Sequence, residues 1–263
     1  MKSTNIIPIW TSHYSIGNSI LTLDNPPPKD KPEEIESYLK GPKSIIQLCD
    51  ENKINPFFLV ENNMSGFVKA YKNSKENNLQ LRFGLKMVVC NDITNKSTDS
   101  LKTEHKVIVF IKNSRGYKQL IKIYSEAATK GFYYRPRIDC TTLEKFWKKS
   151  DLLLVHPFYY SFLHRNLLYF SACQPNYNFA DNIFIIEEND LPFNYLIENA
   201  VNKFCNGKKL KVNAQTIYYE KPEDFKAYIS YKAIHNRQTL DAPNEDHFGS
   251  SQFNLKRWKE LNQ

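Results

Sequence analysis

Short apolar runs alternate with stretches of helical periodicity along almost the whole chain, and this alternation restricts the fold more than any other feature. The runs have the length of β-strands and lie at residues 6–10, 56–60, 81–89, 106–111, 151–155, 182–186 and 209–213. Repeated strand–helix units predict a mostly parallel sheet covered by helices. Seven such strands suit a sheet that closes on itself, so we predict an α/β fold, a distorted (β/α)7 TIM-like barrel.

Three stretches between the runs have one apolar face at helical spacing. They cover residues 117–128, residues 197–205 and a segment that begins near Pro222 and extends through Ala233. Gly207 follows the second stretch, where a helix would end. These faces are predicted to pack against the sheet. The proline cluster at residues 24–32 predicts a surface loop between the first strand and the first helix.

Composition limits the class of protein. The 263 residues show no break that would divide them, so we expect one domain over residues 1–263. The five cysteines form no CxxC pair, which predicts buried free thiols. The chain lacks a signal-like start and an apolar stretch of about 18 residues, which predicts a cytoplasmic protein without a membrane partner.

The net charge is +8 and the isoelectric point is about 9.0. This charge favours a polyanionic partner such as DNA. A lysine-rich surface that reflects biased composition explains the same charge, and the sequence leaves both readings open. The high Asn and Lys usage suggests a phage or a reduced genome as the source.

Two strings carry most of the specific information. Residues 131–139 read GFYYRPRID, and residues 238–256 read QTLDAPNEDHFGSSQFNLK. They resemble segments of the N-terminal polymerase-and-histidinol-phosphatase (PHP) domain of bacterial DNA polymerase III alpha subunits. Residues 59–71, 105–120 and 221–224 continue the resemblance in the same order. The resemblance implies a PHP-type barrel in which residues 237–263 correspond to the segment that leads into the polymerase module, a module that we expect to be absent here.

In active PHP domains, histidines and carboxylates at several strand ends hold up to three divalent ions, which activate water against a phosphate ester. The resemblance places these ligand positions on residues that mostly lack a suitable donor: Ile9, Thr11, Lys86, Phe158, Leu191, Gln215 and Ile217. An ammonium group at one of these positions would repel a metal ion. We therefore expect a degenerate site, with no metal or other cofactor and no catalytic residue.

A rearranged site is the alternative. The residual candidate ligands are His13, Glu61, His156, Glu187 and Asp190. If three of them converge, the chain would bind zinc or manganese and act as a phosphoesterase or 3′–5′ exonuclease. A further alternative is the N-terminal piece of a split DNA polymerase III alpha. We expect no polymerisation by this chain alone, because it lacks the palm carboxylates of a polymerase module.

One loop combines cations with aromatic rings. Its candidate contact residues for nucleic acid or a partner are Lys130, Tyr133, Tyr134, Arg135 and Arg137. The competing interpretation is that the tyrosines pack at the rim of the barrel while Asp139 caps the next turn. The sequence thus predicts a pseudoenzyme that serves as a scaffold or interaction module in DNA replication. The expected partner is a polymerase or another replisome protein, with DNA as a second candidate.

Overall fold

The computed structural model describes residues 6–25, 43–207, 210–240 and 250–263. Most of the proline cluster at 24–32 and much of the 238–256 string therefore lie outside the described residues. By their internal contacts the residues form two compact units. Unit 1 comprises residues 1–83, 188–191 and 213–263, and unit 2 comprises residues 84–187 and 192–212.

All seven predicted strands are present. They are β1 (Ile7–Trp10), β2 (Phe57–Glu61), β3 (Leu81–Cys90), β4 (His105–Ile111), β6 (Leu152–His156), β7 (Asn182–Ile186) and β8 (Leu210–Ile217). One further strand, β5 (Arg137–Asp139), was not predicted and comes from the end of the GFYYRPRID string. Both β3 and β8 contribute residues to each unit.

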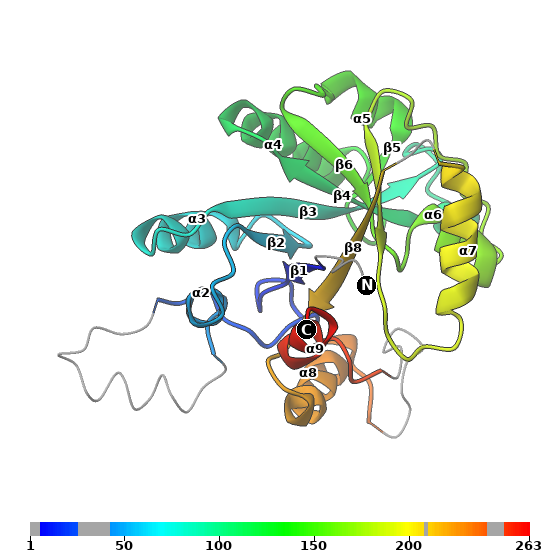
Figure 1. Cartoon of the computed structure of the whole chain (residues 1–263). Helices are drawn as coiled ribbons and strands as arrows, with labels where there is room; N and C mark the ends of the chain where they lie inside the picture. The colour runs from blue at the N-terminus through cyan, green and yellow to red at the C-terminus, as the bar shows by residue number, and fades with distance from the viewer. Residues whose placement is uncertain (1–5, 26–42, 208–209, 241–249) are drawn as a thin grey trace. The chain divides into compact units, whose positions relative to one another are not determined.

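The hydrogen-bonding order of the strands closes on itself. The order is β2-β1-β8-β7-β6-β4-β3-β5, and β2 also pairs with β3. Seven strands thus form a closed ring, while β5 is attached to β3 outside it. Strand β4 runs antiparallel to both of its neighbours. The predicted fold class, a distorted α/β barrel of the TIM-like kind, is confirmed (Figure 1).

The three predicted apolar stripes lie on helices α4, α7 and α8. Unit 1 holds α2 (Ile45–Glu51), α3 (Phe67–Glu76), the 3-10 turn η2 (Pro222–Asp224), α8 (Phe225–Asn236) and α9 (Leu255–Leu261). Unit 2 holds the 3-10 helix η1 (Thr98–Thr103), α4 (Ser114–Thr129), α5 (Cys140–Phe146), α6 (Phe162–Leu168) and α7 (Asn194–Cys205). No helix in the described part of the chain is both long and apolar enough to cross a membrane.

Local sequence explains where these helices begin and end. Asp139 accepts a hydrogen bond from the backbone N–H of Thr142 at 2.7 Å and so caps α5, as predicted. Asn113 caps α4 by accepting from the Gly116 N–H at 3.0 Å. Helix α7 ends at Asn206 (φ 41°), and Gly207 follows with φ 71°, which is the left-handed stop expected at this glycine.

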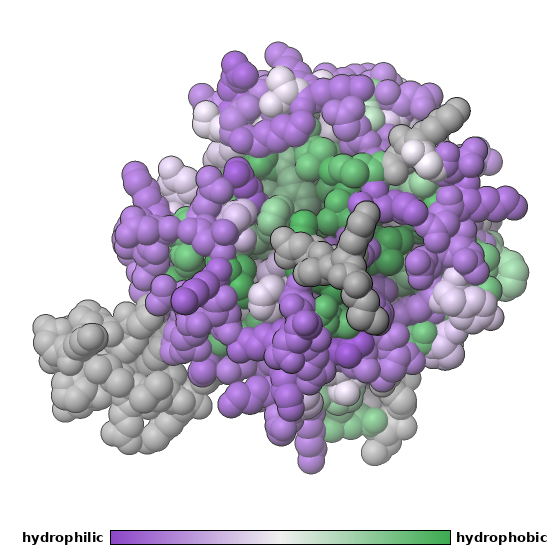
Figure 2. Space-filling view, in the orientation of Figure 1, coloured by the Kyte–Doolittle hydropathy of each residue, from purple (hydrophilic) through white to green (hydrophobic). Residues whose placement is uncertain are grey.

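Hydrophilic residues cover much of the face shown in Figure 2. Helix α9 is bound to the first strand region of unit 1. The indole Nε1 of Trp258 donates to the Ile6 carbonyl at 2.7 Å, and the Ile6 N–H donates to Oδ1 of Asn262 at 3.0 Å. The end of the described chain therefore supports its beginning within one unit.

Candidate functional site

The pairing of β1 with β8 decides which side chains share a face in unit 1. Ile9 lies opposite Thr216, and Trp10 lies opposite Ile217. Paired residues of neighbouring strands point to the same side, so Ile9 shares its face with Thr216, whereas Gln215 and Ile217 point to the other side. Metal ligands must converge from one face. Of the ligand positions that the resemblance implies, Ile9 therefore lies on one face of this strand pair, and Gln215 and Ile217 lie on the other.

The face of unit 1 that carries Ile9 offers little to a metal ion. It continues through Phe58 of β2 and through Ala214 and Thr216 of β8. Thr11 follows β1 and is 3% exposed. Protein sites for zinc and manganese are built from imidazole, thiolate and carboxylate groups. The polar groups on these five side chains are hydroxyls, so these residues do not fit the group that the resemblance implies.

Glu61, the one carboxylate retained at the end of β2, binds the loop that follows β1. Its Oε1 accepts the Ser12 backbone N–H at 3.0 Å, and its Oε2 accepts the hydroxyl of Ser15. Ser15 Oγ in turn accepts the Asn62 N–H at 2.8 Å. The Glu61 side chain is fully buried, so both carboxylate oxygens already fasten two loops together.

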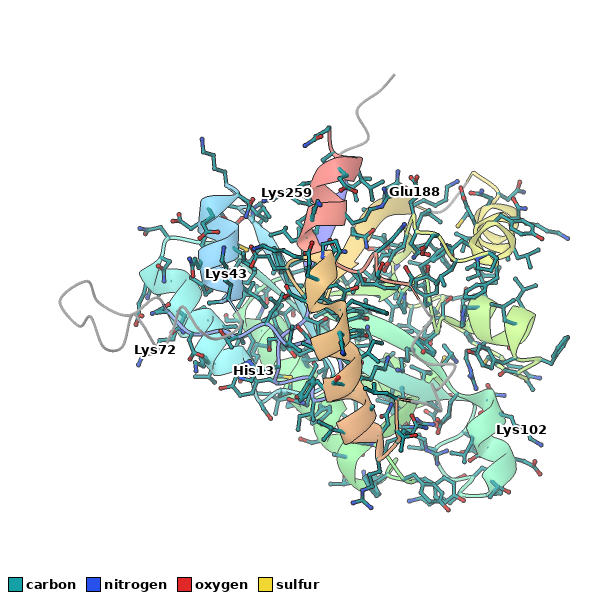
Figure 3. All side chains as sticks on the ribbon, turned by 90° about the horizontal axis from the view of Figure 1, so that it is seen from below. His13, Lys43, Lys72, Lys102, Glu188 and Lys259 are labelled. Atoms are coloured by element: carbon teal, nitrogen blue, oxygen red, sulfur yellow. The ribbon has the colours of Figure 1, made fainter. Side chains whose placement is uncertain are left out.

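The remaining candidates in unit 1 lie in ordinary loop surroundings. The Nδ1 atom of His13 lies 3.2 Å from the Leu21 carbonyl, and its ring packs on Tyr14 with the centroids 4.4 Å apart. The His13 carbonyl accepts a long hydrogen bond, 3.5 Å, from the hydroxyl of Tyr231 on α8, beside which Figure 3 labels His13. Asp190 is exposed. Leu191, also in unit 1, is partly exposed and offers no donor atom.

In unit 2 the strand register separates Lys86 from His156. Lys86 pairs with Ile108, Ile108 pairs with Val155, and Val155 pairs with Ile183, so these four side chains face the same way. His156, the next residue after Val155, faces the opposite way. A metal site cannot use the Lys86 position and His156 together, because a sheet lies between them.

His156 is packed among aromatic rings. Its Nε2 lies 2.9 Å from Oδ1 of Asn182, and its ring stacks on Phe184 with centroids 4.3 Å apart and an interplanar angle of 23°. The ring of Tyr177 lies 5.2 Å away, and the Tyr177 hydroxyl is 2.7 Å from Nε2 of His105. Burial, followed by the nearby His156, lowers the pKa of His105 to about 3. The histidine pair therefore belongs to the core of unit 2.

Across the described ranges, which include every candidate ligand above, no three His, Cys, Asp or Glu side chains lie close enough together to hold a metal ion. Phe158 is 1% exposed and supplies only a hydrocarbon ring. Glu187 follows β7 and is also buried. The five cysteines are free, and all but Cys140 are buried, as predicted.

Comparison with known proteins identifies the family behind this geometry. A family model described as the PHP domain matches residues 40–161. Residues 40–161 are therefore PHP-like. The match begins just before α2 and ends after β6, so it includes Glu61, Lys86 and His156.

The relatives of the PHP domain are polymerase subunits. The DNA polymerase III subunit alpha of Aquifex aeolicus is 24% identical over 250 residues, which cover 85% of this chain and 22% of that protein. The corresponding subunit of Borreliella burgdorferi is 37% identical over 86 residues, 32% of this chain and 8% of that protein. That of Chlamydia trachomatis is 28% identical over 134 residues, 50% and 10% respectively. The chain spans about a fifth or less of the length of these curated relatives.

The GFYYRPRID loop of the PHP domain is divided between interior and surface. Arg137 has no exposed surface: its guanidinium donates to Ser100 Oγ at 2.9 Å, to the Asn95 carbonyl at 3.1 Å and to Glu104 at 3.4 Å. The expectation that Arg137 is a contact residue is thereby corrected, since a group without exposed surface cannot meet a partner. Tyr133 packs over this guanidinium with its centroid 4.9 Å from the central carbon.

The other three candidates of the loop stay accessible. The side chain of Arg135 is 53% exposed and pairs with Glu104 at 2.6 Å, while that of Lys130 is 72% exposed and pairs with Glu126 at 3.0 Å. Tyr134 is 74% exposed. The sequence did not single out Glu104 or Ser100, the partners of Arg137. A buried acid that follows a polar 3-10 segment carries no periodic signal by which it could have been found.

Proposed function

We propose that the PHP domain of this chain is a non-catalytic interaction module of DNA replication, and that its partner is a polymerase or another replisome protein. The observation that carries the proposal is the composition of the strand faces where the resemblance places metal ligands. In unit 1, the ligand position on Ile9 lies beside Thr216, and in unit 2 another ligand position is taken by Lys86. Relatives named as DNA polymerase III alpha supply the replication context.

The chemistry supports this choice. Metal-assisted hydrolysis of a phosphate ester needs an ion that lowers the pKa of a bound water, and the ion needs several lone-pair donors on one face. Glu61 uses both carboxylate oxygens to hold the Ser12–Ser15 loop. His156 faces away from Lys86 and contacts Asn182. Glu61 and His156 are therefore occupied in structural roles.

We expect the purified protein to retain substoichiometric metal after expression with zinc and manganese supplied, because its ligand faces lack imidazole and carboxylate groups. Elemental mass spectrometry measures this directly. A nuclease assay with manganese on single-stranded DNA should show no nucleotide release above that of a His156→Ala variant. One or more equivalents of metal per chain, with release abolished in His156→Ala, would instead establish the phosphoesterase or exonuclease with a rearranged site.

The interaction role makes a separate prediction. The tagged protein, expressed at its natural level and purified under mild conditions, should recover a replication protein in defined stoichiometry, as judged by quantitative mass spectrometry. Recovery of a polymerase chain would also support a polymerase module supplied in trans. Recovery of chaperones and ribosomal proteins alone would contradict the interaction role, whatever the metal content.

A further inference from the structure

Unit 2 exposes three large aromatic rings that the role above does not explain. We call Phe132, Tyr134 and Phe170 the aromatic rim. They are 50%, 74% and 91% exposed. Scattered apolar residues on a surface are normal, but a phenylalanine that gives up almost none of its surface on folding contributes nothing to the core. The rim therefore calls for a role outside the fold.

The backbone under two of these rings is strained. Tyr134 has φ 58° and Phe170 has φ 50°, in the left-handed region that bulky residues seldom occupy. This conformation costs free energy, which a fold normally recovers by packing the side chain. Both rings nonetheless stay mostly exposed, although the ring of Tyr134 packs edge-on against Tyr133 with the centroids 4.6 Å apart. At Phe170 the conformation also ends α6, because the Ser171 N–H donates to the Arg165 carbonyl at 3.2 Å. The exposure of the two rings is therefore what points to a binding surface.

One segment, residues 91–104, connects the two ends of the rim. The Nζ atom of Lys96 donates to the Phe132 carbonyl at 3.0 Å. At the other end, the Ala172 N–H donates to the Lys102 carbonyl at 3.3 Å, and Nδ2 of Asn91 donates to the Ala172 carbonyl at 2.9 Å. The loops that carry Phe132 and Phe170 are thus hydrogen-bonded to the same segment, within one unit.

Cations accompany the rings. Apart from the buried Arg137, residues 91–104 and 130–137 contain four basic and three acidic side chains. Lys96 is exposed, Lys102 is 74% exposed, and Arg135 is 53% exposed. Lys102 lies on η1 and is labelled in Figure 3 on the outside of that helix. Asp99 pairs with Lys102 at 2.9 Å and Glu104 pairs with Arg135 at 2.6 Å, so the positive excess is modest. Stacking would have to supply most of the affinity.

We propose that the aromatic rim binds single-stranded nucleic acid, with bases stacked on Phe132, Tyr134 and Phe170 and phosphates held by Lys96, Lys102 and Arg135. Exposed rings with flanking cations are the means by which proteins hold single strands without reading their sequence. A duplex keeps the faces of its bases stacked inside, so it cannot use the rings. This binding does not depend on whether the PHP domain recruits a replication protein.

The test is fluorescence anisotropy of the full chain with a fluorescein-labelled oligo-dT of 20 nucleotides, at low and at moderate salt. The wild type should bind saturably, and binding should weaken as salt rises. The double variant Tyr134→Ala/Phe170→Ala should bind at least about tenfold more weakly, because each stacked base is lost with its ring. Lys102→Gln should reduce the salt dependence.

The matched control is Tyr195→Ala, which removes a tyrosine on α7 of the same unit that is 62% exposed but lies outside the rim. It should bind like the wild type. The proposal is overturned if the oligonucleotide shows no saturable binding, if Tyr195→Ala weakens binding as much as the double variant, or if duplex DNA binds as tightly as the single strand. Loss of replication-protein recovery in the double variant with no oligonucleotide binding by the wild type would assign the rim to a protein partner.

Discussion

Replacing Arg137 with methionine should destabilise the protein by about 3–5 kcal/mol, the usual cost of breaking a buried ion pair from one side. Arg137 has no exposed surface and holds Glu104, Ser100 and two backbone carbonyls, of Gly131 and Asn95, at 2.9–3.4 Å. Methionine fills most of the volume but leaves these buried acceptors without their donor. Urea unfolding followed by circular dichroism measures the loss as a fall in the midpoint.

Arg135→Met is the matched control, because Arg135 pairs with the same Glu104 from a half-exposed position. This variant should lose about 1 kcal/mol or less of its free energy of unfolding, as for other solvent-exposed ion pairs. If the two variants were equally destabilised, burial would not explain how much the contacts of Arg137 contribute to the free energy of unfolding. The comparison also separates stability from binding, since Arg135 belongs to the proposed nucleic-acid surface and Arg137 does not.

Acid should destabilise the protein well before its carboxylates are protonated. Burial lowers the pKa of His105 to about 3 and that of His164 to about 4. In the unfolded chain both imidazoles take up protons below about pH 6.5, whereas the folded state stays neutral until its lowered pKa values are reached. The stability is therefore complete above pH 6.5 and is lost as the pH falls. We expect a loss of about 5 kcal/mol between pH 7.5 and pH 4.5.

Unfolding in urea at four pH values across this range would measure the slope of the free energy of unfolding against pH. His164→Phe should flatten it, because the phenyl ring keeps the packing against Tyr159 and Tyr169 without the titrating group. His105→Gln should flatten it as well. If the His105→Gln/His164→Phe double variant kept the wild-type slope, groups other than these two histidines would cause the acid sensitivity.

The strands were predictable because a buried strand needs a local run of apolar residues. Each of the seven apolar runs became a strand within a few residues of its predicted ends, and 182–186 agreed at both ends. The exception is β5, whose sequence Arg-Ile-Asp follows a proline and carries charges at both ends. Its buried arginine is hydrogen-bonded to Glu104 and Ser100. These partners lie more than 30 residues away in the sequence, so the local sequence gives no sign of them.

The candidate site was less predictable, because a site depends on which face each strand presents. Matching motifs placed ligand positions on Ile9, Gln215 and Ile217. Because Ile9 pairs with Thr216, the side chains of Gln215 and Ile217 lie on the face opposite to Ile9. Likewise, His156 is a plausible ligand by residue type and faces away from Lys86 by register. A shift of one residue reverses the face and leaves the composition of the segment unchanged.

The hydrogen bonds from Ile6 to Trp258 and Asn262 bear on how the chain is made. They span 252 and 256 residues. Unit 2 consists largely of one continuous stretch, residues 84–187, and a ribosome finishes that stretch long before it reaches α9. Because α9 is synthesised after residues 84–187, the two hydrogen bonds that hold Ile6 can form only once that whole stretch has been made. The contacts of Ile6, next to β1, with α9 are thus among the last that the described chain can complete.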